Sequence, residues 1–187
     1  GFTVGRALDK TGWLSSDTAE LVFDNCRIPA ANLLGIEHEG FRSIMQNFQT
    51  ERIALGAMAV GNATQALALT LRHVRDRRAF GATLFDKQAV RQRLAMLDAK
   101  VRAARQYLYH CAWLVTQGLN SDQVVQDVSL LKALTGELVN EVAYSCQQFH
   151  GGMGYMRESP IERLERDVRV RAIGGGATEA MPEEVTK

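Results

Sequence analysis

Two patterns of hydrophobic and polar positions divide the chain near residue 36. Before it, short runs at residues 3–4 and 20–23 are rich in β-branched and aromatic residues and are separated by turn-forming residues. From residue 38 onward, apolar residues recur at steps of three and four, the spacing of one helix face. We therefore expect a mainly α protein. Residues 1–36 would be the end of an incomplete β domain, and residues 37–187 an antiparallel helix bundle.

Three long segments carry the helical pattern, and each has an apolar stripe suited to the bundle core. In the first stripe one position is occupied by Glu51 instead of an apolar residue. A shorter helix is predicted from Pro160 to about Ala172, and a last helix from near Thr178. The three stripes are Phe41, Ile44, Phe48, Leu55 and Met58; Leu94, Leu97, Val101, Ala104, Leu108, Cys111 and Val115; and Val128, Leu131, Thr135, Leu138, Val142 and Phe149.

Composition and charge narrow the classes of function. Of 187 residues, 46% are hydrophobic and 23% charged, as in globular proteins, and the net charge of +1 leaves no basic footprint for nucleic acid. No apolar run approaches the roughly 20 residues of a membrane span. Cys26, Cys111 and Cys146 lie far apart, and neither a CxxC nor an HExxH motif occurs, so no metal site is expected.

Glu51 is the first candidate for chemistry, because its place in an apolar stripe predicts burial. Burial disfavours the charged carboxylate and raises its pKa, which suits a general base near neutral pH. The alternative is a structural glutamate paired with Arg52 or another arginine.

Three further segments could hold a ligand. Arg77 and neighbouring arginines precede Phe80 and Gln88, and could contact a phosphate and a planar ring; a solvated helix end is the alternative. Glycines 151, 152 and 154 follow one helix, and glycines 174–176 follow another. Such runs let a backbone approach a ligand closely, although a helix-ending turn accounts for one glycine of each.

Taken together and in order, these segments resemble the acyl-CoA dehydrogenase family over essentially the whole chain, with long-chain and isovaleryl-type members closest in pattern. The pieces that carry the resemblance are Lys10-Thr11-Gly12-Trp13, Ile28-Pro29, Glu51-Arg52-Ile53, Arg77-Arg78-Ala79-Phe80-Gly81 with Gln88, Gln148-Phe149-His150-Gly151-Gly152-Met153-Gly154-Tyr155, and Arg166-Asp167.

The resemblance implies a subunit of N-terminal helices, a central β barrel and a C-terminal bundle, of which this chain holds the last barrel strands and the bundle. It also implies FAD, shared across the interface of a homodimer or homotetramer. The cofactor contacts it implies are Arg77, Phe80 and Gln88 from a neighbouring subunit, and Gln148, Phe149, His150, Gly151, Gly152, Thr178 and Glu179.

One departure from the common family pattern bears on the catalytic base. Most members carry it in the loop after the Arg-Asp helix, where this chain has Gly175. A subset, including isovaleryl- and long-chain-type enzymes, carries it on the first bundle helix at the position of Glu51. The resemblance therefore implies Glu51 as the base and the Gly175 N–H as a donor to the thioester carbonyl, with Arg52 and Gly176 on the substrate side.

The implied reaction is α,β-dehydrogenation of an acyl-CoA, with electrons passing to electron-transfer flavoprotein. An acyl-CoA oxidase or flavin monooxygenase of the same fold, and a non-catalytic helical interaction module, remain alternatives. Frequent arginine favours a bacterial, cytoplasmic protein, with the mitochondrial matrix as the alternative compartment.

Overall fold

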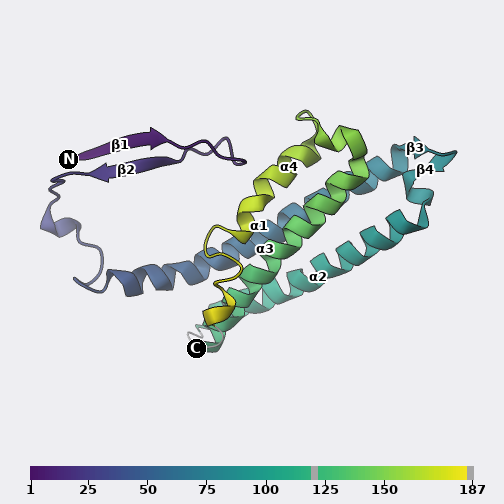
Figure 1. Cartoon of the computed structure of the whole chain (residues 1–187). Helices are drawn as coiled ribbons and strands as arrows, with labels where there is room; N and C mark the ends of the chain where they lie inside the picture. The colour runs from purple at the N-terminus through teal and green to yellow at the C-terminus, as the bar shows by residue number, and fades with distance from the viewer. Residues whose placement is uncertain (119–121, 185–187) are drawn as a thin grey trace.

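The computed structural model describes residues 1–118 and 122–184, and confirms a mainly helical fold. Three long helices, α1 (Gly40–Asp76), α2 (Gln88–Thr116) and α3 (Asp122–His150), run alongside one another, and α4 (Pro160–Val168) packs against α3 (Figure 1). Successive long helices run antiparallel, as short connections favour.

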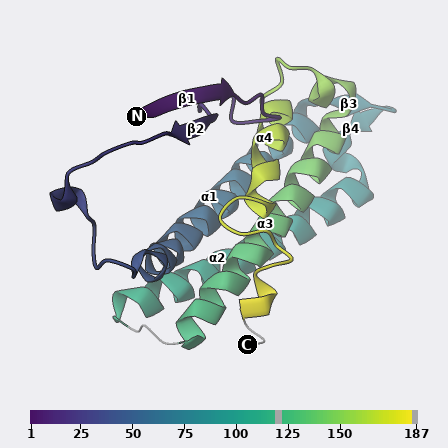
Figure 2. The same cartoon turned by 60° about the vertical axis from the view of Figure 1, so that its left-hand side comes forward.

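Strands β1 (Phe2–Ala7) and β2 (Ala19–Phe23) include the two predicted short runs, and they pair antiparallel as a hairpin that precedes the bundle. Its side chains are largely exposed, and Figures 1 and 2 show it lying to one side of the helices. Only its connecting loop is tied to α4, where the Trp13 N–H donates to Asp167 Oδ1 at 2.6 Å. Two strands alone bury too little surface for a core. Their assignment to an incomplete β domain ending at residue 36 stays a prediction.

The core lies between α1, α2 and α3. The predicted stripe of α2 is buried from Leu94 to Cys111, and only Val115, at its end, is exposed. In α3 the predicted stripe is buried from Val128 to Val142, whereas Phe149 is half-buried. Helix α1 meets α3 chiefly through small residues, and a methyl group added at Gly56 would lie 3.3 Å from Leu131 Cγ. Small side chains here allow two helix backbones to approach closely.

The prediction for the first stripe of α1 is wrong in this chain. Phe41, Ile44 and Met58 are exposed, and so is Glu51 in the middle of the stripe. The buried face of α1 lies about one residue further round the helix and consists of Arg52, Gly56, Ala59, Val60, Ala63, Ala66, Thr70 and Val74. Both sets repeat every three or four residues, and the prediction followed the larger side chains.

A small hairpin, which the sequence analysis did not predict, joins α1 to α2. Strands β3 (Arg78–Ala79) and β4 (Ala82–Thr83) flank Phe80 and Gly81, both of which have positive φ, at 53° and 79°. Two such residues form the two-residue turn that fits the twist of paired strands. A 3₁₀ turn over Leu84–Asp86 then leads into α2.

After α3, short elements carry the chain back along the bundle. A 3₁₀ turn over Gly151–Tyr155 precedes α4, which begins at Pro160 as predicted, and a second over Arg169–Ala172 follows it. The predicted last helix near Thr178 is wrong. Residues 178–181 form turns and Pro182–Glu184 a 3₁₀ turn, since Pro182 has no N–H to continue an α-helical ladder.

Helix α1 is the one described helix long and apolar enough to cross a bilayer, with a mean hydropathy of 1.3 over its best 18-residue window. Core helices of globular proteins pass the same test, so this is weak evidence for a span. Within the described chain, 39% of that window is buried, where α1 packs on α2 and α3.

Candidate functional site

The N-terminal end of α1 extends beyond the other helices at the left of Figure 1, and Glu51 lies about three turns into this helix, next to Arg52. The Glu51 side chain is exposed, together with most of the apolar stripe around it. The predicted burial of the Glu51 carboxylate is therefore wrong for this chain alone. Glu51 shares its stripe with exposed Phe41, Ile44 and Met58, whereas Phe48 and Leu55 are half-buried. Exposed apolar side chains on one helix face suit contact with another body.

The glycine loop of residues 174–176 lies on the same side of α1 as Glu51. A Cβ atom built on Gly175 would stand 2.2 Å from Leu55 Cδ1, so the loop backbone lies directly against Leu55. Leu55 follows Glu51 by four residues and shares its helix face. Gly175 has a φ of +72°, which a glutamate would adopt only with strain. This chain is thus built for a carboxylate on the helix and a glycine in the loop.

The two polar groups of Gly175 are in different situations. Its carbonyl accepts a hydrogen bond from Arg52 Nε at 3.4 Å. Its N–H has no hydrogen-bond partner within residues 1–118 and 122–184. The loop therefore presents a backbone donor that remains available to a ligand.

Arg52 is buried, with 3% of its surface exposed, even though it adjoins Glu51. Besides Gly175, its guanidinium donates to Ser129 Oγ on α3 at 3.2 Å. Its burial favours a role in orienting the loop over the direct substrate contact that the sequence analysis also considered.

A second cluster forms at the other end of the bundle, where α1 ends and α3 turns back. A hollow of about 590 Å³ brings together Arg77 and the predicted run from Gln148 to Gly152. Gly151 has a φ of +58°, and no atom comes within 4 Å of a Cβ built on Gly151 or Gly152. The backbone there is open to close approach by a ligand, which a side chain would block.

Two stacked histidines line this hollow, and one of them, His73, was missed by the sequence analysis. The ring centroids of His73 and His150 are 4.2 Å apart. His150 Nδ1 lies 2.9 Å from the Cys146 carbonyl oxygen, which accepts a hydrogen bond from it. Burial, the neighbouring His150 and the charge of Arg77 together lower the pKa of His73. His73 stands one helical turn before Arg77, and that spacing was the signal that could have revealed it.

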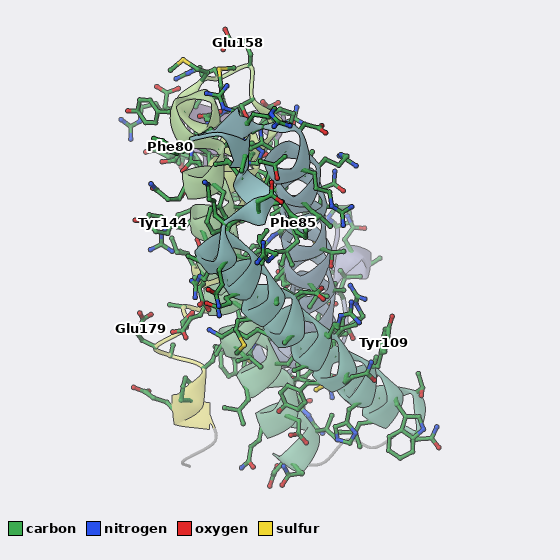
Figure 3. All side chains as sticks on the ribbon, turned by 90° about the vertical axis from the view of Figure 1, so that its right-hand side faces the viewer. Phe80, Phe85, Tyr109, Tyr144, Glu158 and Glu179 are labelled. Carbon is green, nitrogen blue, oxygen red and sulfur yellow. The ribbon has the colours of Figure 1, made fainter. Side chains whose placement is uncertain are left out.

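The remaining predicted contacts do not join this cluster within one chain. Phe80 is 93% exposed at the tip of the β3–β4 hairpin, and Gln88 is exposed at the start of α2. The Thr178 N–H bonds to the Ala172 carbonyl at 3.0 Å, next to the glycine loop. In Figure 3, Phe80 and Glu179 lie well apart along the bundle, each directed outward. The predicted cofactor residues thus do not form a single cluster within this chain.

Comparison with known proteins identifies the family. Residues 38–187 match the family model described as the C-terminal domain of acyl-CoA dehydrogenase. The chain belongs to the acyl-CoA dehydrogenase family. The family resemblance drawn from its motifs is therefore confirmed.

Relatives and a solved structure of the acyl-CoA dehydrogenase family match nearly the whole chain. The long-chain specific acyl-CoA dehydrogenase of Sus scrofa mitochondria is 40% identical over 100% of the chain and 43% of that protein. An acyl-CoA dehydrogenase of Bacillus subtilis is 38% identical over 96% of the chain and 46% of that protein. The crystal structure of a probable acyl-CoA dehydrogenase from Mycobacterium abscessus superimposes with a TM-score of 0.95 at 42% identity, covering 100% of the chain and 49% of the other.

The chain thus spans slightly less than half the length of these acyl-CoA dehydrogenase relatives, which include bacterial and mitochondrial proteins.

Proposed function

We propose that the complete protein oxidises an acyl-CoA thioester to the trans-2-enoyl-CoA, with Glu51 as the base that removes the α-proton. The observation that carries this proposal is the arrangement of the Glu51 helix face and the Gly175 loop. The Gly175 loop lies against Leu55, which follows Glu51 by about one helical turn on the same face of α1, so a carboxylate and an open backbone N–H lie on one side of this helix. A base and a carbonyl-binding donor on the same side suit proton abstraction next to a thioester.

Glu51 would act as a base only when its surroundings become apolar. In this chain the carboxylate faces outward among exposed apolar side chains. An acyl chain, a flavin ring and the rest of the subunit would cover that stripe and desolvate the carboxylate, which raises its pKa toward neutral pH. A base with such a pKa takes up a proton readily at physiological pH.

The Gly175 N–H would hold the thioester carbonyl. Proton removal from the α-carbon moves negative charge onto the carbonyl oxygen, giving an enolate. A preorganised N–H donor lowers the energy of that charge most when water is excluded. The same hydrogen bond fixes the α-carbon relative to Glu51 and so orients the proton to be removed.

The hollow near Arg77 has the features of a site for the phosphate end of FAD. A guanidinium pairs well with phosphate, the Gln148 amide can donate or accept, and Gly151 and Gly152 leave their N–H groups accessible. FAD, when bound, supplies the acceptor for the β-hydride. Because Phe80 and Gln88 are exposed and do not line this hollow, and Thr178 and Glu179 lie elsewhere, we propose that one FAD is held by two subunits of a homodimer or homotetramer.

Two further parts of the proposal are the acceptor of the electrons from the reduced flavin and the cellular compartment of the protein. We propose electron-transfer flavoprotein as the acceptor, with an oxidase reacting directly with oxygen as the alternative, and the bacterial cytoplasm as the compartment.

The test uses the complete protein purified with its flavin. A panel of straight and branched acyl-CoA thioesters is added without oxygen, and flavin absorbance is followed. We expect at least one thioester to reduce the flavin, and the reduced protein to transfer electrons to electron-transfer flavoprotein faster than to dissolved oxygen. Faster reaction with oxygen would support the oxidase instead. A protein that purifies without flavin and binds no thioester would contradict the enzymatic assignment.

A further inference from the structure

A buried lysine of α3 contacts the glycine loop and has no role in the proposed proton abstraction. Lys132 lies on α3 with 1% of its surface exposed, and it is among the largest fully buried side chains of the bundle. Its Nζ donates to the Gly176 carbonyl oxygen. The neighbouring carbonyl, that of Gly175, accepts from Arg52 of α1. Two buried cations from two different helices therefore hold two consecutive carbonyls of one loop.

This arrangement costs free energy and is not needed for packing alone. Burial and the nearby charge of Arg52 lower the pKa of Lys132, whereas Glu179 acts in the opposite direction. Replacing buried charged groups by apolar side chains of similar size is often neutral or stabilising. A core position on α3 could hold leucine or methionine, as the neighbouring Leu131 shows. The lysine is therefore better explained by what it holds than by what it contributes to the core.

Lys132 helps to hold the conformation of the loop peptide that carries the open Gly175 N–H. Before that peptide, the Gly174 N–H bonds to the Val170 carbonyl at 2.8 Å. After it, the Gly175 and Gly176 carbonyls are bonded to Arg52 and Lys132. Because each peptide unit is planar, holding the units before and after this one restricts the directions that the Gly175 N–H between them can take.

The loop needs such anchoring because its backbone is unusual. Gly175 and Gly176 have φ values of +72° and +116°, and neither lies in a helix or strand that would hold it by a ladder of hydrogen bonds. Glycine loses more conformational freedom on ordering than other residues. Without fixed partners for its carbonyls, this segment would sample several orientations of the Gly175 N–H.

We propose that Lys132 is a positioning residue that, together with Arg52, locks the glycine loop so that the Gly175 N–H stays directed at the thioester carbonyl. This inference rests on the proposed function. Lys132 touches neither substrate nor base, and acts through the loop. The proposal predicts that loss of the lysine impairs the chemical step more than substrate binding or folding.

The experiment compares the complete flavin-loaded wild-type protein with Lys132→Met, Lys132→Gln and Leu138→Ala. Methionine fills a similar volume without a donor, and glutamine retains an N–H that can reach toward the Gly176 carbonyl. Leu138 is buried on the same helix and belongs to the core, so Leu138→Ala controls for lost stability. For each protein we would measure flavin content, thermal midpoint, kcat and KM with the best acyl-CoA of the panel. The infrared carbonyl stretch of bound, carbonyl-labelled enoyl-CoA reports on the hydrogen bond itself.

For Lys132→Met we expect kcat to fall about 10- to 100-fold, the size of effect that a misplaced reacting group produces. KM and flavin content should change much less, because binding contacts remain. The carbonyl stretch should move toward that of free enoyl-CoA. Lys132→Gln should lie between Lys132→Met and the wild type in both kcat and carbonyl stretch. Leu138→Ala should lower the thermal midpoint while leaving the carbonyl stretch unchanged.

Three outcomes would overturn the inference. An unchanged kcat and carbonyl stretch in Lys132→Met would mean that the loop is set without the lysine. Failure of both Lys132 variants to fold, when Leu138→Ala folds, would make the lysine a stability residue. A wild-type flavin that no acyl-CoA reduces would overturn the proposed function and this inference with it, whereas the first two outcomes leave the proposed function intact.

Discussion

Helices α1 and α2 carry apolar stripes of the same spacing, yet only one of them lies in the core. The stripe of α2 is buried from Leu94 to Cys111. The stripe of α1, with Glu51 at its centre, is exposed at Phe41, Ile44 and Met58. Figure 1 shows the N-terminal end of α1 projecting past the other helices. The spacing of apolar residues thus identifies an apolar helix face, but it does not identify the part of the protein or the ligand that covers this face.

The difference in exposure indicates that the α2 stripe contributes to stability, whereas the α1 stripe is available for function. Residues of α2 contribute by removing apolar surface from water within this chain. Residues of the α1 stripe leave that surface available, next to a carboxylate and an open loop N–H. The same hydrophobic signal therefore marks a core in one helix and, on our proposal, a ligand-binding face in the other.

The largest effect is expected from Glu51→Gln in the complete protein. The amide keeps the size of the side chain but cannot accept the α-proton, so flavin reduction by acyl-CoA should slow by about 10²- to 10⁴-fold. Stopped-flow absorbance of the flavin measures that rate, and flavin content should equal that of the wild type.

Glu51→Asp provides the matched control for this variant. It retains a carboxylate at a shorter reach and should keep part of the rate. Reduction of Glu51→Gln at the wild-type rate would remove Glu51 from the mechanism and leave the α1 stripe without a catalytic role.

A comparison of Leu97→Ala and Ile44→Ala tests the two stripes by stability. Leu97 is fully buried on α2, and Leu97→Ala should lower the free energy of unfolding by about 2–5 kcal/mol. Ile44 is 53% exposed here, so Ile44→Ala should cost less than about 0.5 kcal/mol in the 187-residue chain. Urea unfolding measures both values.

The same Ile44→Ala change should cost more in the complete protein, where we expect the stripe to be covered. An equal, small cost in both proteins would mean that nothing covers this face, and the contrast between α1 and α2 would lose its functional meaning.

The smallest effect on the free energy of unfolding is expected from Glu141→Gln, at the edge of the contact between α2 and α3. Glu141 accepts from Lys100 Nζ at 2.8 Å and from Arg93 at 3.1 Å, and these cations lower its pKa below 4.5. A lowered carboxylate pKa stabilises the fold above the unfolded pKa, and this contribution is lost as the pH falls through the folded pKa. Because Glu141 is partly exposed, Glu141→Gln should cost only about 0.2–1 kcal/mol at pH 7.

At pH 3 the difference between wild type and Glu141→Gln should be smaller than at pH 7, because protonation of Glu141 increases as the pH falls and removes the charge that pairs with the two cations. Unfolding midpoints in urea at the two pH values measure it. A difference that persists unchanged at pH 3 would indicate a role in packing instead of ion pairing.

Particular elements differ in how far the sequence predicted them. The three long helices, the first hairpin and the start of α4 at Pro160 follow from local patterns, because each is specified by neighbours within a few residues. The β3–β4 turn depends on positive φ at Phe80, which a residue with a side chain rarely adopts, and was missed. The helix expected near Thr178 fails because Pro182 follows too soon.

Within the candidate site, the sequence by itself determined which residue types are present: a carboxylate in an apolar stripe, a run of glycines after the Arg-Asp helix, and a motif order that indicates the family. Only the tertiary structure decided that Glu51 faces outward, that the loop lies against Leu55, and that Lys132 and Arg52 meet behind it. Periodicity reports neighbours along one helix, whereas these contacts join residues 44 to 123 positions apart, whose meeting depends on how the helices pack.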